Sequence, residues 1–184
     1  NEIRCLVRYA VDELGLESQP LQVDTGSGVL ACQWFRDGEH VSAVRVAMGP
    51  CRFQRASVSI EGDGEATEIP VEAGGQGFQA TGVSVGNPHM VIFHEAPSDL
   101  VHQWGPSLTG HPLWQAGANV EGVRVITPTH LEVSVWERGC GPTQACGTGA
   151  TAAAAAAVRH GHSPANAAIT VTLPGGDLEI EIAS

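Results

Sequence analysis

The sequence predicts an α+β fold built from two similar units, and two observations support this prediction. The order helix, strand, glycine turn, strand occurs twice, over residues 1–35 and 148–182. Leu21 and Ile169 begin matching apolar segments at a spacing of 148 residues, and a glycine turn follows each segment. Most other apolar residues alternate with polar ones over short runs, which is typical of strands with one buried face. We therefore expect each copy to belong to one of two related domains.

The first copy is expected to contain one helix and three strands. Over residues 1–14 apolar side chains recur on one side of a helix that ends before Gly15. Gly49-Pro50 closes the unit, and we divide the chain into an N-terminal domain of residues 1–52 and a C-terminal domain of residues 53–184. Alternating apolar residues between glycine turns predict strands at 21–24, 29–35 and 41–48.

The second domain is expected to be richer in strands. Residues 53–72 are polar with alternating apolar positions and predict two edge strands, with Pro70 as a break. A short helix over 98–104 is expected to be capped by Ser98-Asp99 and stopped by Gly105-Pro106. The other predicted elements are strands at 78–85, 90–93, 120–127, 130–136 and 168–173, a helix from Gly149, and a final strand that ends at Ile182.

The composition limits the classes of function. The chain has 184 residues and a formal net charge of −11, which argues against nucleic acid and membrane surfaces as partners. Its nine basic residues are all arginine, so it cannot supply the Schiff-base lysine of a pyridoxal phosphate enzyme. The five cysteines form no Cys-x-x-Cys pair and are expected to be reduced thiols. With no apparent signal peptide or long apolar run, the sequence predicts a cytoplasmic protein.

Cys146 lies between a predicted strand and a predicted helix and is the first candidate for a catalytic residue. Gly147, Thr148 and Gly149 follow it and lead into a run of alanines. The free N–H groups and partial positive charge of a first helical turn favour a carboxylate or phosphate and lower the pKa of a nearby thiol. Cys146 is therefore expected to be a reactive thiolate beside an anion site. A cysteine that only packs in the core and a phosphate-binding loop remain alternatives, although the chain lacks a Gly-Lys-Ser/Thr motif.

Gly86-Asn87-Pro88-His89 interrupts a predicted strand and forms a second candidate site. A sheet gains nothing from an asparagine, a proline and a histidine in such a place, so we expect these side chains to serve a ligand or a reaction. An ordinary turn with a surface histidine is the alternative interpretation.

Several motifs together resemble the diaminopimelate epimerase family. Trp136-Glu137-Arg138-Gly139-Cys140-Gly141-Pro142-Thr143-Gln144-Ala145-Cys146-Gly147-Thr148-Gly149-Ala150 closely resembles the second signature of that family, and Gly86-Asn87-Pro88-His89 resembles its central motif. Asn1-Glu2-Ile3-Arg4-Cys5 is similar to the end of its first signature, Cys-Gly-Asn-Gly-x-Arg-Cys, with Glu2 in place of a glycine. Leu173-Pro174-Gly175-Gly176 also fits the family, so the resemblance covers essentially the whole chain.

The resemblance implies an isomerase of lysine biosynthesis that interconverts LL- and meso-diaminopimelate without a cofactor or metal. In that family one thiolate removes the α proton while a thiol on the opposite face delivers another, and two helix N-termini stabilise the developing charge. The implied fold has two pseudo-symmetric domains, each a mostly antiparallel, barrel-like sheet around a central helix. The chain would hold one nearly complete domain and part of the other, and a homodimer is one assembly that the resemblance allows.

The resemblance assigns roles to individual positions. Cys146 matches one of the two acid/base cysteines, Glu137 resembles a residue of the distal-end pair that is also near enough to tune it, and His89 matches the histidine beside the other cysteine. We therefore name Cys146, Glu137 and His89 as candidate catalytic residues. The candidate substrate-binding residues are Asn1, Asn87, Asn119, Glu137, Arg138, Gly147 and Thr148.

The sequence has no initiator methionine and opens inside a helical pattern, so we expect a fragment that lacks the start of the N-terminal domain and the C-terminal end. Aligning Asn1 with Thr148 would place the partner of Cys146 two residues before Asn1, and we expect this piece alone to be inactive. A proline racemase or phenazine-type isomerase of the same superfold is one alternative, although Glu137-Arg138 favours a substrate with a second polar end. A non-catalytic amino-acid-binding module is the other alternative.

Overall fold

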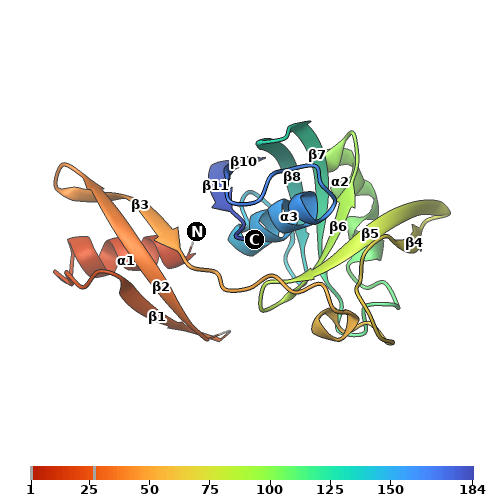
Figure 1. The fold of residues 1–184 in the computed structure, drawn as a ribbon, viewed down its shortest axis with the longest axis horizontal. Coiled ribbons are helices and arrows are strands. Elements are labelled where there is room, and N and C mark those ends of the chain that lie inside the picture. The colour runs from red at the N-terminus through yellow and green to blue at the C-terminus, as the bar shows by residue number, and fades with distance from the viewer. Residues whose placement is uncertain (1, 27) are drawn as a thin grey trace. The chain divides into compact units, whose positions relative to one another are not determined.

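The computed structural model describes residues 2–26 and 28–184, which form one compact unit ending at Gly49 and a second starting at Pro50 (Figure 1). In the first unit a helix packs on a three-stranded antiparallel sheet, as the sequence predicts. The elements are α1 (Glu2–Asp12), β1 (Leu21–Thr25), β2 (Gly28–Asp37) and β3 (His40–Val46). The core of this unit contains the buried residues Val7, Val11, Val23, Cys32 and Val41. Asn1, a predicted ligand residue, lies outside the described residues.

The second unit is built on one eight-stranded sheet. Its strands follow the order β11-β10-β8-β7-β6-β5-β4, and β9 pairs with β8 beside this path. β6 and β7 are parallel, as are β8 and β10, and the other neighbours are antiparallel. No pairing joins β4 to β11 within the described residues, so the sheet is open. The strands are β4 (Ile69–Ala73), β5 (Gln76–Ser84), β6 (Pro88–Phe93), β7 (Asn119–Thr127), β8 (His130–Glu137), β9 (Gly141–Thr143), β10 (Ala168–Leu173) and β11 (Gly176–Glu181).

Two helices contact the central strands of this sheet. α3 (Gly147–Arg159) contacts β5, β6, β7, β8, β10 and β11, and the sheet curves around it (Figure 1). Its alanines at 152–157 are all buried, because a helix that is apolar all round is stable only when it is enclosed. α2 (Pro97–Leu108) contacts β4, β7, β8 and β9.

Strand alternation sorts the residues of β6 and β7 between the two helices. Met90, Ile92 and Val120 belong to the hydrophobic core that also contains Leu100 of α2. Because side chains alternate along a strand, the intervening residues of β6 and β7 point to the opposite face, toward α3.

The repeat seen in the sequence is present in the strand registers. The β1–β2 hairpin pairs Val23 with Leu30, and the β10–β11 hairpin pairs Val171 with Leu178, each residue lying 148 positions after its equivalent. The hairpin that follows α1 and the hairpin that follows α3 therefore have the same strand register.

Three local predictions are wrong. Residues 53–68 contain a 3-10 helix (Arg55–Val58) and one isolated bridge, between Gln54 and Glu65, in place of an edge strand, and Pro70 lies inside β4. A proline is tolerated there because β4 is the last strand of the sheet and leaves one side unpaired. The helix α2 starts after Ala96 and continues through Gly105-Pro106, because close packing of Gly105 on Trp136 and burial of Leu108 stabilise its last turn.

None of the described helices is long and apolar enough to cross a membrane.

Candidate functional site

The topology of the second unit brings candidate residues that are distant in sequence to the same end of three neighbouring strands. β6 and β7 run parallel with His89 opposite Asn119, so both residues lie near the start of their strands. β8 runs antiparallel to β7, so its last residue, Glu137, lies at the same end of the sheet as the start of β7. Three candidates from separate parts of the sequence, His89, Asn119 and Glu137, are therefore neighbours in the fold.

Cys146 is the residue that immediately precedes α3, as predicted. Its extended backbone, with φ −138° and ψ 108°, ends the loop, and its side chain takes the place of a capping residue. The Gly149 N–H group donates a hydrogen bond to Cys146 Sγ at 3.4 Å, and Thr148 Oγ1 lies 3.4 Å from the same sulfur. Only 8% of Cys146 is exposed. The thiol is thus held at the N-terminus of the helix rather than packed along its side.

The expected fall in the thiol pKa is wrong. Burial raises the pKa of Cys146 above its ordinary value, and the carboxyl groups of Glu121 and Glu137 act in the same direction. The hydrogen bonds from Thr148 and Gly149 lower this pKa but do not outweigh burial. At neutral pH the group is therefore a thiol, and removal of its proton produces a thiolate that is a strong base.

The first turn of α3 keeps backbone donors available for an anion. The first helical hydrogen bond runs from the Ala150 N–H group to the Cys146 carbonyl at 2.9 Å. Gly147 and Thr148 precede that bond, so their N–H groups have no acceptor within the helix. Both residues are partly exposed, and an added Cβ at Gly147 would meet nothing within 4 Å. A carboxylate can approach these two donors directly.

His89 is completely buried and lies in a chain of polar contacts. Its Nδ1 atom is 2.7 Å from Glu121 Oε1, and its Nε2 atom is 3.0 Å from Asn87 Oδ1. The turn 85–87 between β5 and β6 supplies the asparagine, and β7 supplies the glutamate. The interruption of the predicted strand by Asn87, Pro88 and His89 is thus a hairpin turn whose polar side chains point inward.

Glu121 is a site residue that the sequence reasoning missed. It is 0% exposed and faces α3, where its Oε1 atom would lie 2.9 Å from a Cβ added to Gly149. Cys146 Sγ would lie 3.3 Å from the same added atom, so the sulfur and the carboxyl group flank one glycine. The available signal was a single acid within the apolar start of a central strand, where a charge is costly without a partner.

Glu137 and Arg138 follow β8 and are held by different partners. The Thr143 hydroxyl donates a hydrogen bond to Glu137 Oε1 at 2.6 Å, which ties the carboxyl group to β9. The Arg138 N–H group donates to Asn119 Oδ1 at 2.9 Å, and its guanidinium group donates to the Ala116 carbonyl. Asn119 and Arg138 are therefore directly connected.

The loop before Cys146 is held by the turn between β10 and β11. The Gly175 N–H group donates to the Gln144 carbonyl at 2.7 Å, and a Cβ at Gly175 would lie 2.8 Å from that oxygen. The turn between β10 and β11 therefore packs against the loop so closely that only glycine fits.

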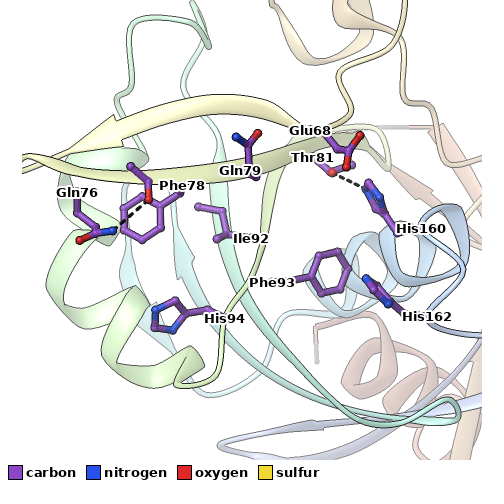
Figure 2. A pocket seen from close by; sticks show the side chains of 11 residues that line it. Glu68, Gln76, Phe78, Gln79, Thr81, Ile92, Phe93, His94, His160 and His162 are labelled. Atoms are coloured by element: carbon purple, nitrogen blue, oxygen red, sulfur yellow. Dashed lines mark hydrogen bonds between the residues drawn. The ribbon is translucent and has the colours of Figure 1, made fainter.

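A separate cavity of about 410 Å³ lies elsewhere in the second unit (Figure 2). Three histidines, His94, His160 and His162, line it. The Phe93 ring packs against His160 and His162, and His160 Nε2 is 2.8 Å from Thr81 Oγ1. The other labelled lining residues are Glu68, Gln76, Phe78, Gln79 and Ile92. None of the candidate catalytic residues contributes to it.

Residues 81–184 match the family model described as diaminopimelate epimerase. The chain is 44% identical over 184 residues to a diaminopimelate epimerase of Desulfitobacterium hafniense, covering 98% of this chain and 64% of that protein. It is 43% identical to a diaminopimelate epimerase of Moorella thermoacetica, with 98% and 65% covered. The chain thus spans less than two thirds of the length of these relatives.

Solved structures with low sequence identity share the fold. A probable proline racemase from Agrobacterium radiobacter, with bound carbonate, matches with a TM-score of 0.74 at 13% identity, covering 99% of this chain and 58% of that one. A predicted epimerase from Pseudomonas aeruginosa matches with a TM-score of 0.62 at 14% identity, covering 97% and 66%. These likenesses establish the α+β fold that the sequence predicts, and the family match over more than half of the residues is more specific. The chain belongs to the diaminopimelate epimerase family.

Proposed function

We propose that this chain is part of an epimerase that interconverts LL- and meso-diaminopimelate in lysine biosynthesis, without a cofactor. The observation that carries the proposal is the position of Cys146, whose sulfur lies at the start of α3, where the N–H groups of Gly147 and Thr148 have no acceptor within the helix. Family membership adds the substrate, because the relatives named above are diaminopimelate epimerases. A carboxylate bound to Gly147 and Thr148 would bring the α carbon of an amino acid next to the thiol.

The chemistry of the reaction accounts for this arrangement. An α proton beside a carboxylate is very weakly acidic, so the base must be strong and the developing negative charge must be stabilised. Burial of Cys146 makes its thiolate a stronger base than an exposed one. The N-terminus of α3 supplies fixed dipoles that point at the substrate carboxylate, where charge accumulates in the transition state.

The remaining candidates have proposed roles at the edge of the same site. Glu137 would tune the thiol and, with Arg138, hold the distal end of the substrate. Its hydrogen bond from Thr143 and the contact of Arg138 with Asn119 are consistent with a site of fixed geometry. Asn87 and Asn119 would bind the substrate, and His89 would lie beside the opposite thiol.

Inversion at carbon requires a second acid/base group on the opposite face. We propose that residues 1–52 belong to the N-terminal domain and residues 53–184 to the C-terminal domain, and that the second thiol lies at the start of the helix equivalent to α3. Asn1 would donate there to the same carboxylate. The 184 residues alone would then fail to interconvert the two isomers.

The test uses nuclear magnetic resonance of LL-diaminopimelate in deuterium oxide. We expect the purified 184-residue chain to form no meso isomer, and turnover at the rate of a longer protein containing it would refute this. In the longer protein, Cys146→Ala should slow the reaction by about 10²- to 10⁴-fold, because an acid/base group is lost. Cys140→Ala, a change of the exposed cysteine in the same loop, should leave the rate within about twofold of wild type.

Other outcomes identify the alternatives. Epimerisation of proline in preference to diaminopimelate would favour the proline racemase activity. Tight binding of diaminopimelate without exchange of its α proton, unaffected by Cys146→Ala, would favour a binding module.

A further inference from the structure

Glu121 is a buried acid whose two oxygens have different surroundings. Oε1 is 2.7 Å from His89 Nδ1, whereas Oε2 has no hydrogen-bond partner among the described residues. Both side chains of the pair are 0% exposed. A polar group without a hydrogen bond is costly in the interior, and an ionised carboxylate with an unsatisfied oxygen costs more than a neutral group. The pair therefore needs an arrangement of protons that avoids this cost.

The contact of His89 with Asn87 limits the possible arrangements. Asn87 Oδ1 is an acceptor, so the 3.0 Å contact requires a proton on His89 Nε2. With Nε2 protonated, Nδ1 either carries a second proton and faces an ionised Glu121, or accepts a proton from a neutral Glu121. The two arrangements differ in the charge that they place in the interior.

The groups around Glu121 favour the neutral acid. Glu137 and Cys146 are the other titratable groups near it, and neither supplies a positive charge. Burial raises the pKa of Glu121, the Glu137 carboxyl group raises it further, and His89 alone opposes the shift. A neutral acid donates from Oε1 and leaves only a carbonyl oxygen without a partner, which costs far less than an unpaired carboxylate oxygen.

We propose that Glu121 is a neutral positioning residue that donates a hydrogen bond from Oε1 to His89 Nδ1 and so fixes the Nε2–H tautomer of His89. The Nε2–H group in turn holds Asn87 Oδ1 and leaves the Asn87 amide N–H₂ free to donate to an anionic or carbonyl group of a ligand. Glu121 acts through two residues and does not itself contact the substrate. The role of Asn87 as a ligand residue rests on the proposed function, whereas the tautomer does not.

Gly149 connects this network to the thiol. Because an added Cβ would lie 2.9 Å from Glu121 Oε1 and 3.3 Å from Cys146 Sγ, the glycine allows the acid to pack under the first turn of α3. The position of Glu121 is thereby set from two sides, by the histidine of β6 and by the backbone of α3.

The direct test measures the imidazole nitrogens of His89 by ¹⁵N nuclear magnetic resonance in the 184-residue chain. A His89→Asn spectrum assigns the signals among the eight histidines. Near pH 7 we expect a neutral ring with the proton on Nε2 and an accepting Nδ1. A ring protonated on both nitrogens, or protonated only on Nδ1, would overturn the proposal.

Two substitutions test the positioning role. Glu121→Gln can still donate to Nδ1 and should keep both the Nε2–H tautomer and the hydrogen-bonded ¹⁵N shift of Nδ1, whereas Glu121→Leu leaves Nδ1 without a donor and should move its signal to that of a free imine nitrogen. An unchanged Nδ1 signal in Glu121→Leu would contradict the proposal, and if that variant does not fold, the wild-type and Glu121→Gln spectra still decide. Glu132→Gln is the matched control, because this partly exposed glutamate on β8 pairs with Arg124 away from the site and should have no effect.

A binding measurement separates the inference from the proposed function. In the protein that binds diaminopimelate, Glu121→Leu should raise Kd by about tenfold because the Asn87 amide loses its fixed direction, and Glu121→Gln should change Kd by less than about twofold. Absence of binding by the wild type would count against the proposed function alone, while the tautomer measurement would still decide the role of Glu121.

Discussion

Cys146 Sγ is subject to opposing influences from its immediate neighbours. Burial and the carboxylate of Glu137 raise its pKa, and the hydrogen bonds from Thr148 and Gly149 lower it. The balance favours the protonated thiol, so the proposed reaction would require a change in these surroundings that produces the thiolate. Binding of a substrate at the start of α3 would expel water and alter each of these influences.

The Thr148 hydroxyl is the contact on Cys146 that substitution can remove most selectively. Thr148→Val should raise the midpoint of the pH profile for alkylation of Cys146 by about one pH unit, because a donor to the thiolate is lost. Iodoacetamide labelling followed by fragment-resolved mass spectrometry distinguishes Cys146 from Cys140. Thr151→Val is the control, since its hydroxyl donates to the Gly147 carbonyl and should leave the midpoint unchanged. A shift of equal size in both variants would exclude a specific effect of Thr148.

Glu121 should make the stability of the second unit depend on pH. Its pKa is raised in the folded protein, so above its unfolded value of about 4.3 the folded state holds a proton that the unfolded chain has released. This contribution is fully present below about pH 4.3 and is lost as the pH rises through the folded pKa. The stability of wild type relative to Glu121→Gln should therefore fall by up to ~1.4 kcal/mol per pH unit in that window. Urea unfolding at several pH values measures it, and a difference that increases with pH would contradict the assignment.

Small residues allow the helix α3 to pack closely against its neighbours. Its alanines allow the sheet to curve closely around it, and its first turn leaves room for both a buried acid and a ligand. Gly147 and Gly149 lie in that same turn but have different neighbours. An added Cβ would meet nothing within 4 Å at Gly147, whereas at Gly149 it would collide with Glu121 Oε1.

Substitution of these two glycines should therefore have opposite effects. Gly149→Ala should lower the free energy of unfolding by about 1–3 kcal/mol through overpacking. Gly147→Ala should raise it by up to ~1 kcal/mol, because alanine favours the helix. Urea unfolding in a Trp34→Phe background restricts the fluorescence to the tryptophans of the second unit. Equal losses in both variants would show that the acid does not occupy the space beside Gly149.

At the scale of the whole molecule, the two units repeat one hairpin. Gly28 and Gly176 begin the second strand of their hairpins with φ of 116° and 124°, and neither has a neighbour within 4 Å of an added Cβ. The cost of replacing either glycine is therefore backbone strain rather than a clash.

This equivalence can be measured. Gly28→Ala and Gly176→Ala should each destabilise the local hairpin by about 1–3 kcal/mol, and by similar amounts. Amide hydrogen exchange reports each hairpin separately, through the amides of β1 and β2 or of β10 and β11. A loss confined to one hairpin would show that the two are not physically equivalent despite their common register.

The sequence by itself determined the α+β class, the two related hairpins, the helix that begins after Cys146, and the family. These features depend on local chemistry: alternating apolar residues, glycines in turns, and a capping position before a run of alanines. Sequence also indicated Asn87, His89, Asn119 and Glu137 as members of a site. Their convergence at one end of the strands required the parallel pairing of β6 with β7, which places His89 opposite Asn119, 30 positions later in the sequence.

Only the tertiary structure decided the surroundings of the thiol and the burial of Glu121 beside it. The helix N-terminus predicted a low thiol pKa, but burial and the nearby carboxylate of Glu137 reversed the direction. The continuation of α2 through Pro106 was likewise decided by packing on Trp136 and by burial of Leu108. Desolvation and packing depend on which distant residues surround a group, and that information is absent from any short stretch of sequence.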